Sequence, residues 1–368
     1  MRRFTIGALV SLLATVALSP VALAAKNETR KPAKHVAAKK AVSVKGKPSL
    51  KSSAAHSSRA VKTAQARVIK LSFTKNKRKS GFQHVAFASA LSGVPPLLTA
   101  GDLAGLNLTR DPLDLKSNVA LVLDQATNEV LFEKNAEIAL PIASITKLMT
   151  SLVVVESDQD LEELLVVTED DVDREKFSHS RLRVGSQLTR ANMLHIALMS
   201  SENRAASSLG RHYPGGLSAF VRAMNSKAME LGMNSSRFSD STGLNSSNVS
   251  SARDLAKLVI AAHRHPLIRQ YSTDSRYAVD PGGPQLQYRN SNGLIENPEW
   301  EIGLQKTGYI SEAGRCLVMQ VHIADRPVVM IFLDSKTKQS RLADAGRIRK
   351  WLENRAASAM SQRSAQRS

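Results

Sequence analysis

The chain has 368 residues, of which 51 are Lys or Arg and 32 are Asp or Glu, giving a formal net charge of +19 at pH 7. This length allows one domain with a substantial core and further segments outside it. The single cysteine, Cys316, excludes an internal disulfide, and its apolar, strand-like surroundings predict a buried thiol.

The first residues are typical of a secretory signal peptide. Arg2 and Arg3 precede a mostly apolar run from 6 to 18, and Ala22-Leu-Ala24 fits a small-residue cleavage site. A transmembrane anchor is the alternative, but this run is shorter than the roughly 20 residues that span a bilayer. We therefore expect residues 1–24 to be a cleaved signal and the mature protein to be exported, soluble or loosely membrane-associated.

Residues 26–80 carry most of the positive charge, with 17 Lys and Arg against one acid, Glu28. Large apolar side chains are few, so burial there cannot offset the entropy lost on ordering. We predict a basic, largely disordered arm over 25–112. It is either a solvated tether or an adhesive for an anionic cell-wall polymer or membrane surface. Nucleic acid is not expected, because the chain is exported and only Phe73 within 26–80 could stack on a base.

Regular patterns begin near Asn118. Residues 119–124 and 129–133 predict a β-hairpin, and a helix is expected from about 143 to 155. Ser144 would lie in the first turn of this helix, where the helix dipole favours negative charge. Lys147, three residues further on, would share the face of Ser144 and could act as the base that a serine nucleophile needs.

Residues 188–209 predict two helices broken at 199–203. Ser201 and Asn203 then fall at a helix junction, where side chains can point into a cleft. Asn203 could also cap the second helix. Further helices are predicted over 217–231 and from 251 to about 263.

The last part of the chain predicts three strands, at 301–306, 315–321 and 326–333, and a helix over 341–353. Strands at both ends with helices between them indicate one sheet assembled from N- and C-terminal parts. We therefore predict an α+β domain over 113–355, with a largely helical insertion. A polar tail without an anchor is expected over 356–368.

Three short motifs occur in order along this domain: Ser144-Ile-Thr-Lys147, Ser201-Glu-Asn203 and Lys306-Thr-Gly308. Each alone is weak evidence, because Ser-x-x-Lys is common on solvated helix faces. Together they match the ordered set found in class A β-lactamases and penicillin-binding proteins.

The segments around these motifs, 141–150, 198–206, 212–216 and 305–308, resemble the low-molecular-mass penicillin-binding proteins. Among these they resemble the D-alanyl-D-alanine endopeptidases of the penicillin-binding protein 7 type. The resemblance covers roughly 118–353. It implies a β-lactamase/D,D-peptidase-like fold, an antiparallel sheet with a largely helical subdomain. It also implies cofactor-free, metal-free cleavage of D-alanyl–diaminopimelate cross-links in peptidoglycan, in the periplasm of a Gram-negative type of cell.

The resemblance also implies the catalytic roles. Ser144 would attack the D-alanyl carbonyl and be acylated, by substrate or by β-lactams. Lys147 would take the proton, its pKa lowered by burial and by Lys306. Ser201 would pass the proton to the leaving amine.

Five further positions are implied to bind substrate: Asn203, Lys306, Thr307, Gly308 and Tyr309. Lys306 and Thr307 would bind it and keep the field of the site positive. Gly308 would let it approach the strand edge closely. Backbone N–H groups of Ser144 and Tyr309 would form an oxyanion hole.

Several alternatives stay open. The protein could be a D,D-carboxypeptidase acting on stem pentapeptides, or a non-catalytic wall-binding homologue. A zinc endopeptidase would need ligands such as His263 and His265, but no His-Glu-x-x-His is present. Arg341 could hold a substrate carboxylate, although the start of the last helix is the favoured interpretation. Glu230, which could activate a deacylating water, is interpreted as a helix terminus.

Overall fold

The computed structural model of the protein describes residues 98–366. The predicted signal peptide and residues 25–97 of the predicted arm lie outside the described residues.

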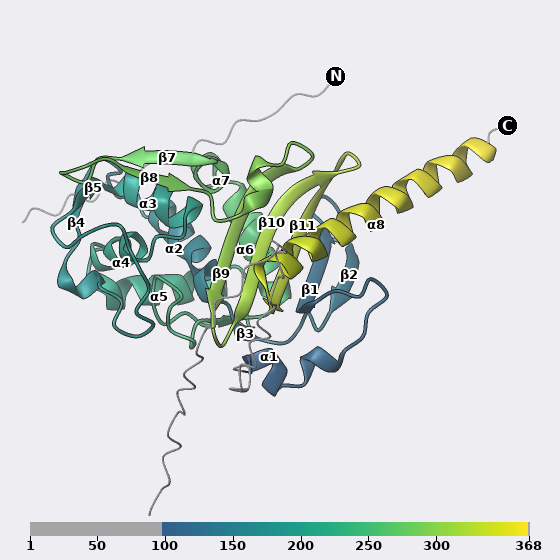
Figure 1. The fold of residues 1–368 in the computed structure, drawn as a ribbon, viewed down its shortest axis with the longest axis horizontal. Helices are drawn as coiled ribbons and strands as arrows, with labels where there is room; N and C mark the ends of the chain where they lie inside the picture. Colours follow the sequence, from purple (N-terminus) through teal and green to yellow (C-terminus); the bar gives the residue numbers. More distant parts are fainter. Residues whose placement is uncertain (1–97, 367–368) are drawn as a thin grey trace, which may run out of the picture. The chain divides into compact units, whose positions relative to one another are not determined.

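A five-stranded antiparallel sheet forms the centre of the described part (Figure 1). Its order is β2-β1-β11-β10-β9, so strands from the two ends of the domain pair directly through β1 and β11. The prediction of one sheet assembled from N- and C-terminal parts is thus confirmed. The strands are β1 (Ser117–Asp124), β2 (Val130–Lys134), β9 (Glu301–Ile310), β10 (Gly314–Ile323) and β11 (Arg326–Ser335).

The segment between β2 and β9 is mainly helical, as predicted. Its helices are α2 (Thr146–Glu156), α3 (Arg190–Met199), α4 (Asn203–Arg211), α5 (Gly216–Glu230), α6 (Ala252–His263) and α7 (Pro266–Thr273). Three short antiparallel pairs complete it: β3 (Leu140–Pro141) with β6 (Val249–Ser250), β4 (Leu164–Val166) with β5 (Gln187–Thr189), and β7 (Arg276–Val279) with β8 (Leu286–Arg289).

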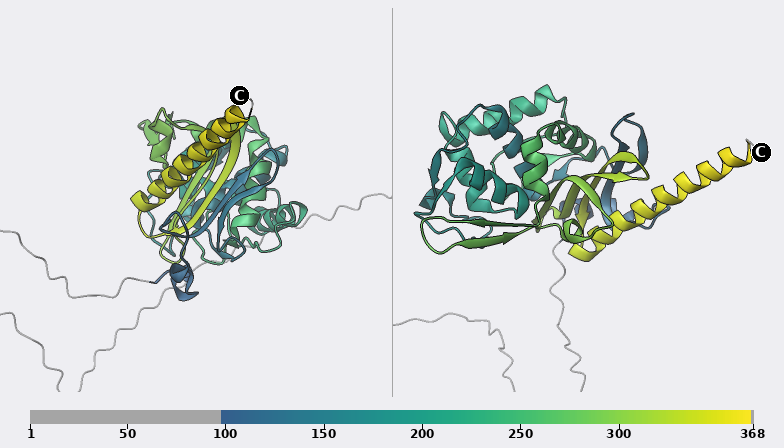
Figure 2. Two further views of the ribbon diagram at one scale, coloured as in Figure 1. Left: turned by 90° about the vertical axis from the view of Figure 1, so that its right-hand side faces the viewer. Right: turned by 90° about the horizontal axis from the view of Figure 1, so that it is seen from above.

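The sheet has a core on each face because successive side chains of a strand point to opposite sides. Val318, Val329 and Ile331 pack into the larger core with the helical subdomain. Leu317 and Met330 pack on the other face against α8 (Lys338–Ala365). Figure 2 shows α8 on one face of the sheet and the helical subdomain on the other.

The C-terminal helix is longer than predicted. It begins at Lys338 and continues through most of the segment 356–368 that we expected to be a polar tail. Thr337 caps its start, accepting a hydrogen bond from the Ser340 N–H. The sequence after Trp351 is rich in Ala, Ser and Arg and lacks Gly and Pro, so nothing interrupts the helix there.

The N-terminal boundary also needs correction, because residues 98–112 are ordered and pack on the domain. Helix α1 (Ala100–Leu103) is capped by Thr99, whose hydroxyl also donates to buried Asp334 on β11. Asp111 forms a buried ion pair with Lys134 on β2. These polar contacts give the segment fixed partners that its composition alone did not reveal.

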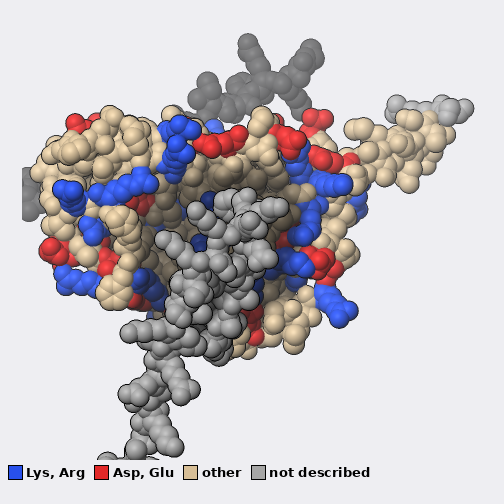
Figure 3. Space-filling model, in the orientation of Figure 1, with Lys and Arg blue, Asp and Glu red and all other residues tan. Residues whose placement is uncertain are grey.

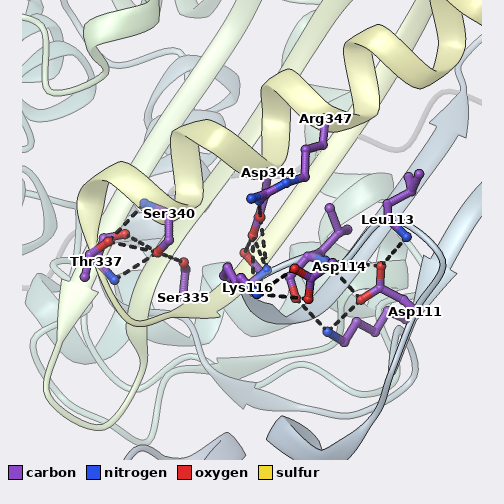
Figure 4. A network of polar contacts seen from close by, with 12 residues as sticks. Asp111, Leu113, Asp114, Lys116, Ser335, Thr337, Ser340, Asp344 and Arg347 are labelled. Carbon is purple, nitrogen blue, oxygen red and sulfur yellow. Dashed lines mark hydrogen bonds and ion pairs between the residues drawn. The ribbon is translucent and has the colours of Figure 1, made fainter.

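A polar network joins this segment to α8 (Figure 4). The Asp344 carboxylate accepts hydrogen bonds from the backbone N–H groups of Lys116 and Ser117, from the Ser117 hydroxyl and from Arg347. The network fixes α8 to the start of β1.

Among the described residues, no helix combines the length and apolarity needed to cross a bilayer.

Candidate active site

Ser144 lies in a 3-10 turn, Ala143–Ile145, that leads directly into α2. The preceding Ala143 has φ 48°, in the left-handed region that alanine rarely occupies. Its carbonyl accepts a hydrogen bond from the Thr146 hydroxyl. A Cβ added to Gly243 would lie 2.0 Å from the same carbonyl oxygen. The turn that presents Ser144 is therefore held in a strained conformation by close backbone packing.

Lys147 is completely buried, and three acceptors surround its amine. The Nζ atom lies 2.8 Å from Ser144 Oγ, 2.7 Å from Asn203 Oδ1 and 2.6 Å from the Thr242 carbonyl oxygen. The amine is thus aimed at the serine hydroxyl by two fixed oxygens from other elements.

Burial lowers the pKa of Lys147 to about 7, although Asp240, Glu202 and Asp173 act to raise it. The predicted effect of burial is confirmed. Lys306 is not among the groups that shift the pKa of Lys147, so its predicted contribution is not confirmed. Burial, and then the charges of Lys147 and Arg341, lower the pKa of Lys306 well below its usual value.

Asn203 is fixed at both ends of its amide. Its Oδ1 accepts from Lys147, and its Nδ2 donates to Ser178 Oγ at 2.8 Å. The cap of α4 is Glu202, whose carboxylate accepts from the Arg204 N–H, so the expected capping role of Asn203 is wrong. Ser201 lies between α3 and α4 with φ 65°, a strained backbone of the kind that clusters at functional sites.

Strand β9 brings the third motif to the same place. Thr307 Oγ1 donates to Ser291 Oγ at 2.7 Å, and the Lys306 amine bonds the Thr307 carbonyl. A Cβ added to Gly308 would lie 2.9 Å from the Ile142 carbonyl oxygen and 3.1 Å from the Ser144 nitrogen. The glycine therefore lets β9 press against the turn that holds Ser144.

Tyr309 follows on β9 with 51 % of its surface exposed. Its ring stacks on the Arg315 guanidinium at 3.5 Å. The side chain thus lies at the surface beside the site, while its backbone belongs to the strand that contacts Ser144.

Three participants were missed by sequence reasoning. Thr242 contributes only a backbone carbonyl, which no side-chain motif signals. Its loop is folded by Asp240, whose carboxylate accepts from the N–H groups of Thr242, Gly243 and Asn245. Ser178 and Ser291 support Asn203 and Thr307 from distant loops, and nothing in their local sequence marks them.

The other candidates lie outside this group. Arg341 is in the first turn of α8, as favoured, buried, and donates to the Cys316 carbonyl at 2.6 Å. Cys316 itself is buried, as predicted. Glu230 ends α5 and pairs with Lys227.

The two candidate zinc ligands diverge. His263 contacts Gln125, whereas His265 contacts Glu156. Within residues 98–366, no group of three or more His, Cys, Asp or Glu side chains could hold a metal ion.

Comparison with known proteins identifies relatives of this arrangement. The chain is 47 % identical over 274 residues to a D-alanyl-D-alanine endopeptidase of Pseudomonas aeruginosa, covering 74 % of this chain and 86 % of that protein. It is 45 % identical over 242 residues to one of Escherichia coli, covering 65 % and 78 %.

Solved structures show the same fold. The Streptomyces K15 DD-transpeptidase superposes with a TM-score of 0.60 at 26 % identity, covering 65 % of this chain and 97 % of that one. Penicillin-binding protein D2 of Listeria monocytogenes, in a cefotaxime-bound form, gives 0.58 at 27 %, covering 65 % and 97 %. The predicted β-lactamase/D,D-peptidase-like fold is confirmed.

The family model described as D-alanyl-D-alanine carboxypeptidase matches residues 107–337, which include all three motifs. Together with the relatives above, this match shows that the chain belongs to the S11 family of serine D,D-peptidases.

Proposed function

We propose that this protein is a serine D,D-endopeptidase that hydrolyses D-alanyl–diaminopimelate cross-links of peptidoglycan through an acyl-enzyme on Ser144. The observation that carries the proposal is the 2.8 Å contact between the Ser144 hydroxyl and the buried Lys147 amine, whose pKa is about 7. An amine with this pKa is unprotonated in half of the molecules at neutral pH and can act as a base. The names of the relatives favour the endopeptidase over the carboxypeptidase.

In the proposed acylation, Lys147 removes the proton of Ser144 as the oxygen attacks the D-alanyl carbonyl. The Asn203 and Thr242 oxygens hold the resulting ammonium in place. Ser201 passes a proton to the leaving amine, and water later releases the acyl group. The N–H groups of Ser144 and Tyr309 stabilise the oxyanion, an effect worth roughly 3–4 kcal/mol per donor in other enzymes.

Lys306 and Thr307 bind the carboxylate beside the scissile bond on the leaving side. Burial disfavours the Lys306 ammonium before substrate binds, which weakens the positive field expected at the site. An incoming carboxylate favours the charged form, so substrate binding and protonation of Lys306 are coupled. Asn203 adds a hydrogen bond to the substrate backbone.

The setting proposed for this activity is the periplasm, reached through a cleaved signal at residues 1–24. The basic arm would hold the enzyme on an anionic wall or membrane surface. No cofactor is required by the proposed chemistry, and β-lactams would acylate Ser144 in place of substrate.

The test is digestion of purified cross-linked peptidoglycan dimers with the wild type and with Ser144→Ala. The proposal expects monomers from the wild type alone. Release of D-alanine from pentapeptides without loss of dimers would identify a carboxypeptidase instead. Absence of any penicillin adduct on folded wild type would favour the non-catalytic homologue.

A further inference from the structure

A group of arginines lies next to the substrate-binding strand. Arg289 ends β8, two residues before Ser291, which accepts the hydrogen bond of Thr307. Between them, Asn290 accepts a hydrogen bond from Gln305 of β9 at 2.9 Å. Two extended residues span about 7 Å, so the Arg289 backbone lies within about that distance of Ser291, the side chain that contacts the third motif.

Arg181 reaches the same hairpin from the loop that supports Asn203. Its guanidinium donates to the Gln287 carbonyl of β8 and lies 4.9 Å from the centre of the Tyr288 ring. Three residues earlier in this loop, Ser178 bonds the amide of Asn203. Arg181 and Arg289 thus belong to the two segments that supply Ser178 and Ser291 to the site.

These arginines are exposed and poorly neutralised. Arg289 is the register partner of Arg276 across the β7–β8 ladder, an arrangement of like charges that costs stability. Arg276 has an exposed partner, Glu296, at 3.7 Å. Among the described residues, no ion pair is formed by Arg181, Arg183 or Arg289. Figure 3 shows basic side chains on the part of this face where β7 and β8 lie.

A cavity beside Arg181 lies at the turn of the β7–β8 hairpin, at the end of the ladder away from Arg289. It has a volume of about 440 Å³ and lies between residues 181–186 and the turn at 281–284. Arg181 and Arg183 line it, and no acidic residue does. Its walls include Gly282 and Gly283, which leave the backbone accessible. The surface is therefore suited to an extended anionic chain rather than to a cation.

We propose that Arg181 and Arg289 form a subsite for the free carboxylates of the stem peptide that leaves when a cross-link is cut. This inference rests on the proposed endopeptidase function. Thr307 would hold the carboxylate beside the scissile bond, and the leaving chain would continue past Ser291 towards the arginines. A carboxypeptidase substrate releases only one D-alanine, which is too short to reach them. The subsite would therefore favour cross-links over pentapeptides.

The experiment compares Arg289→Gln, Arg181→Gln and the double variant on two substrates, cross-linked dimers and stem pentapeptides. Each single substitution should lower kcat/KM on dimers by roughly three- to tenfold, the range for one charge-assisted contact. D-alanine release from pentapeptides should change less than twofold. Arg222→Gln, an exposed arginine of α5, is the matched control and should behave as wild type on both substrates.

A second experiment uses dimers whose free carboxylates are amidated. The wild type should lose its advantage over the double variant on this substrate. Equal cleavage of unmodified dimers by wild type and double variant would overturn the subsite alone. Failure of the wild type to cut dimers would overturn the endopeptidase function and the subsite with it. Parallel losses on both substrates would show a general disturbance of the site and would also overturn the proposal.

Discussion

The two faces of the central sheet treat buried polar groups differently. On the face towards the helical subdomain, Lys147 and Lys306 are fully buried without an ion pair among the described residues, and Ala143 is strained. On the side of α8, buried Asp344 is satisfied by several donors, and Lys134 pairs with Asp111. The first face holds unfavourable interactions where chemistry is proposed, and the Asp344 and Lys134 contacts of the second supply stability.

The comparison predicts that changes towards the cleft alter reactivity, whereas changes near α8 alter the free energy of unfolding. The largest effect is expected for Ser144→Ala, which removes the nucleophile. Loss of hydrolysis on the order of 10⁶-fold is typical when such a serine is removed. Mass spectrometry should find no penicillin adduct, while the unfolding midpoint should stay within a few degrees of wild type.

Lys147→Met should come next, because it removes the base and keeps much of the side-chain volume. Acylation by penicillin should slow by roughly 10²–10⁴-fold, the usual contribution of a general base. Stopped-flow acylation measures this directly. Unchanged acylation would show that another group takes the proton of Ser144.

Asp344→Ala tests the other face. It leaves the buried N–H of Ser117 and the partly buried N–H of Lys116 without this acceptor and frees Arg347. We expect a loss of roughly 3 kcal/mol in the free energy of unfolding, measured with urea, and an unchanged acylation rate at temperatures where the variant is folded. Slower acylation with unchanged stability would erase the contrast between the faces.

Gly308→Ala lies where β9 meets the turn of Ser144. The added methyl meets the Ile142 carbonyl and the Ser144 nitrogen, so β9 must shift. We expect about 1–3 kcal/mol of overpacking strain and a larger relative loss in acylation than in stability. Gly346→Ala is the control, because its Cβ would meet no atom within 4 Å. Equal behaviour of the two variants would contradict the role given to Gly308.

Much of this arrangement could be predicted from the sequence because the motifs are local and their elements are regular. The spacing of Ser144 and Lys147 and the break between α3 and α4 placed Lys147, Ser201 and Asn203 correctly in their elements. The strand pattern around Lys306 placed the third motif. The fold class followed from strands at both ends of the domain.

What escaped prediction depends on contacts between distant segments. The Thr242 carbonyl holds Lys147 from 95 residues away, and a backbone acceptor leaves no trace in composition. Polar side-chain contacts tie residues 98–112 to β2 and β11. Hydrophobic periodicity in the sequence does not reveal such contacts. The lowered pKa of Lys306 depends first on its complete burial, which its local sequence does not reveal.

The most direct test of the central claim is the pH dependence of Ser144 acylation by penicillin. The folded pKa of Lys147, about 7, lies below the ordinary value of 10.5, so the amine is protonated below pH 7 and becomes a base above it. The acylation rate should therefore rise with pH along a limb with an apparent pKa near 7, and Lys147→Met should abolish that limb. A wild-type limb near pH 10.5, or one that persists unchanged in Lys147→Met, would contradict the assignment of Lys147 as the base.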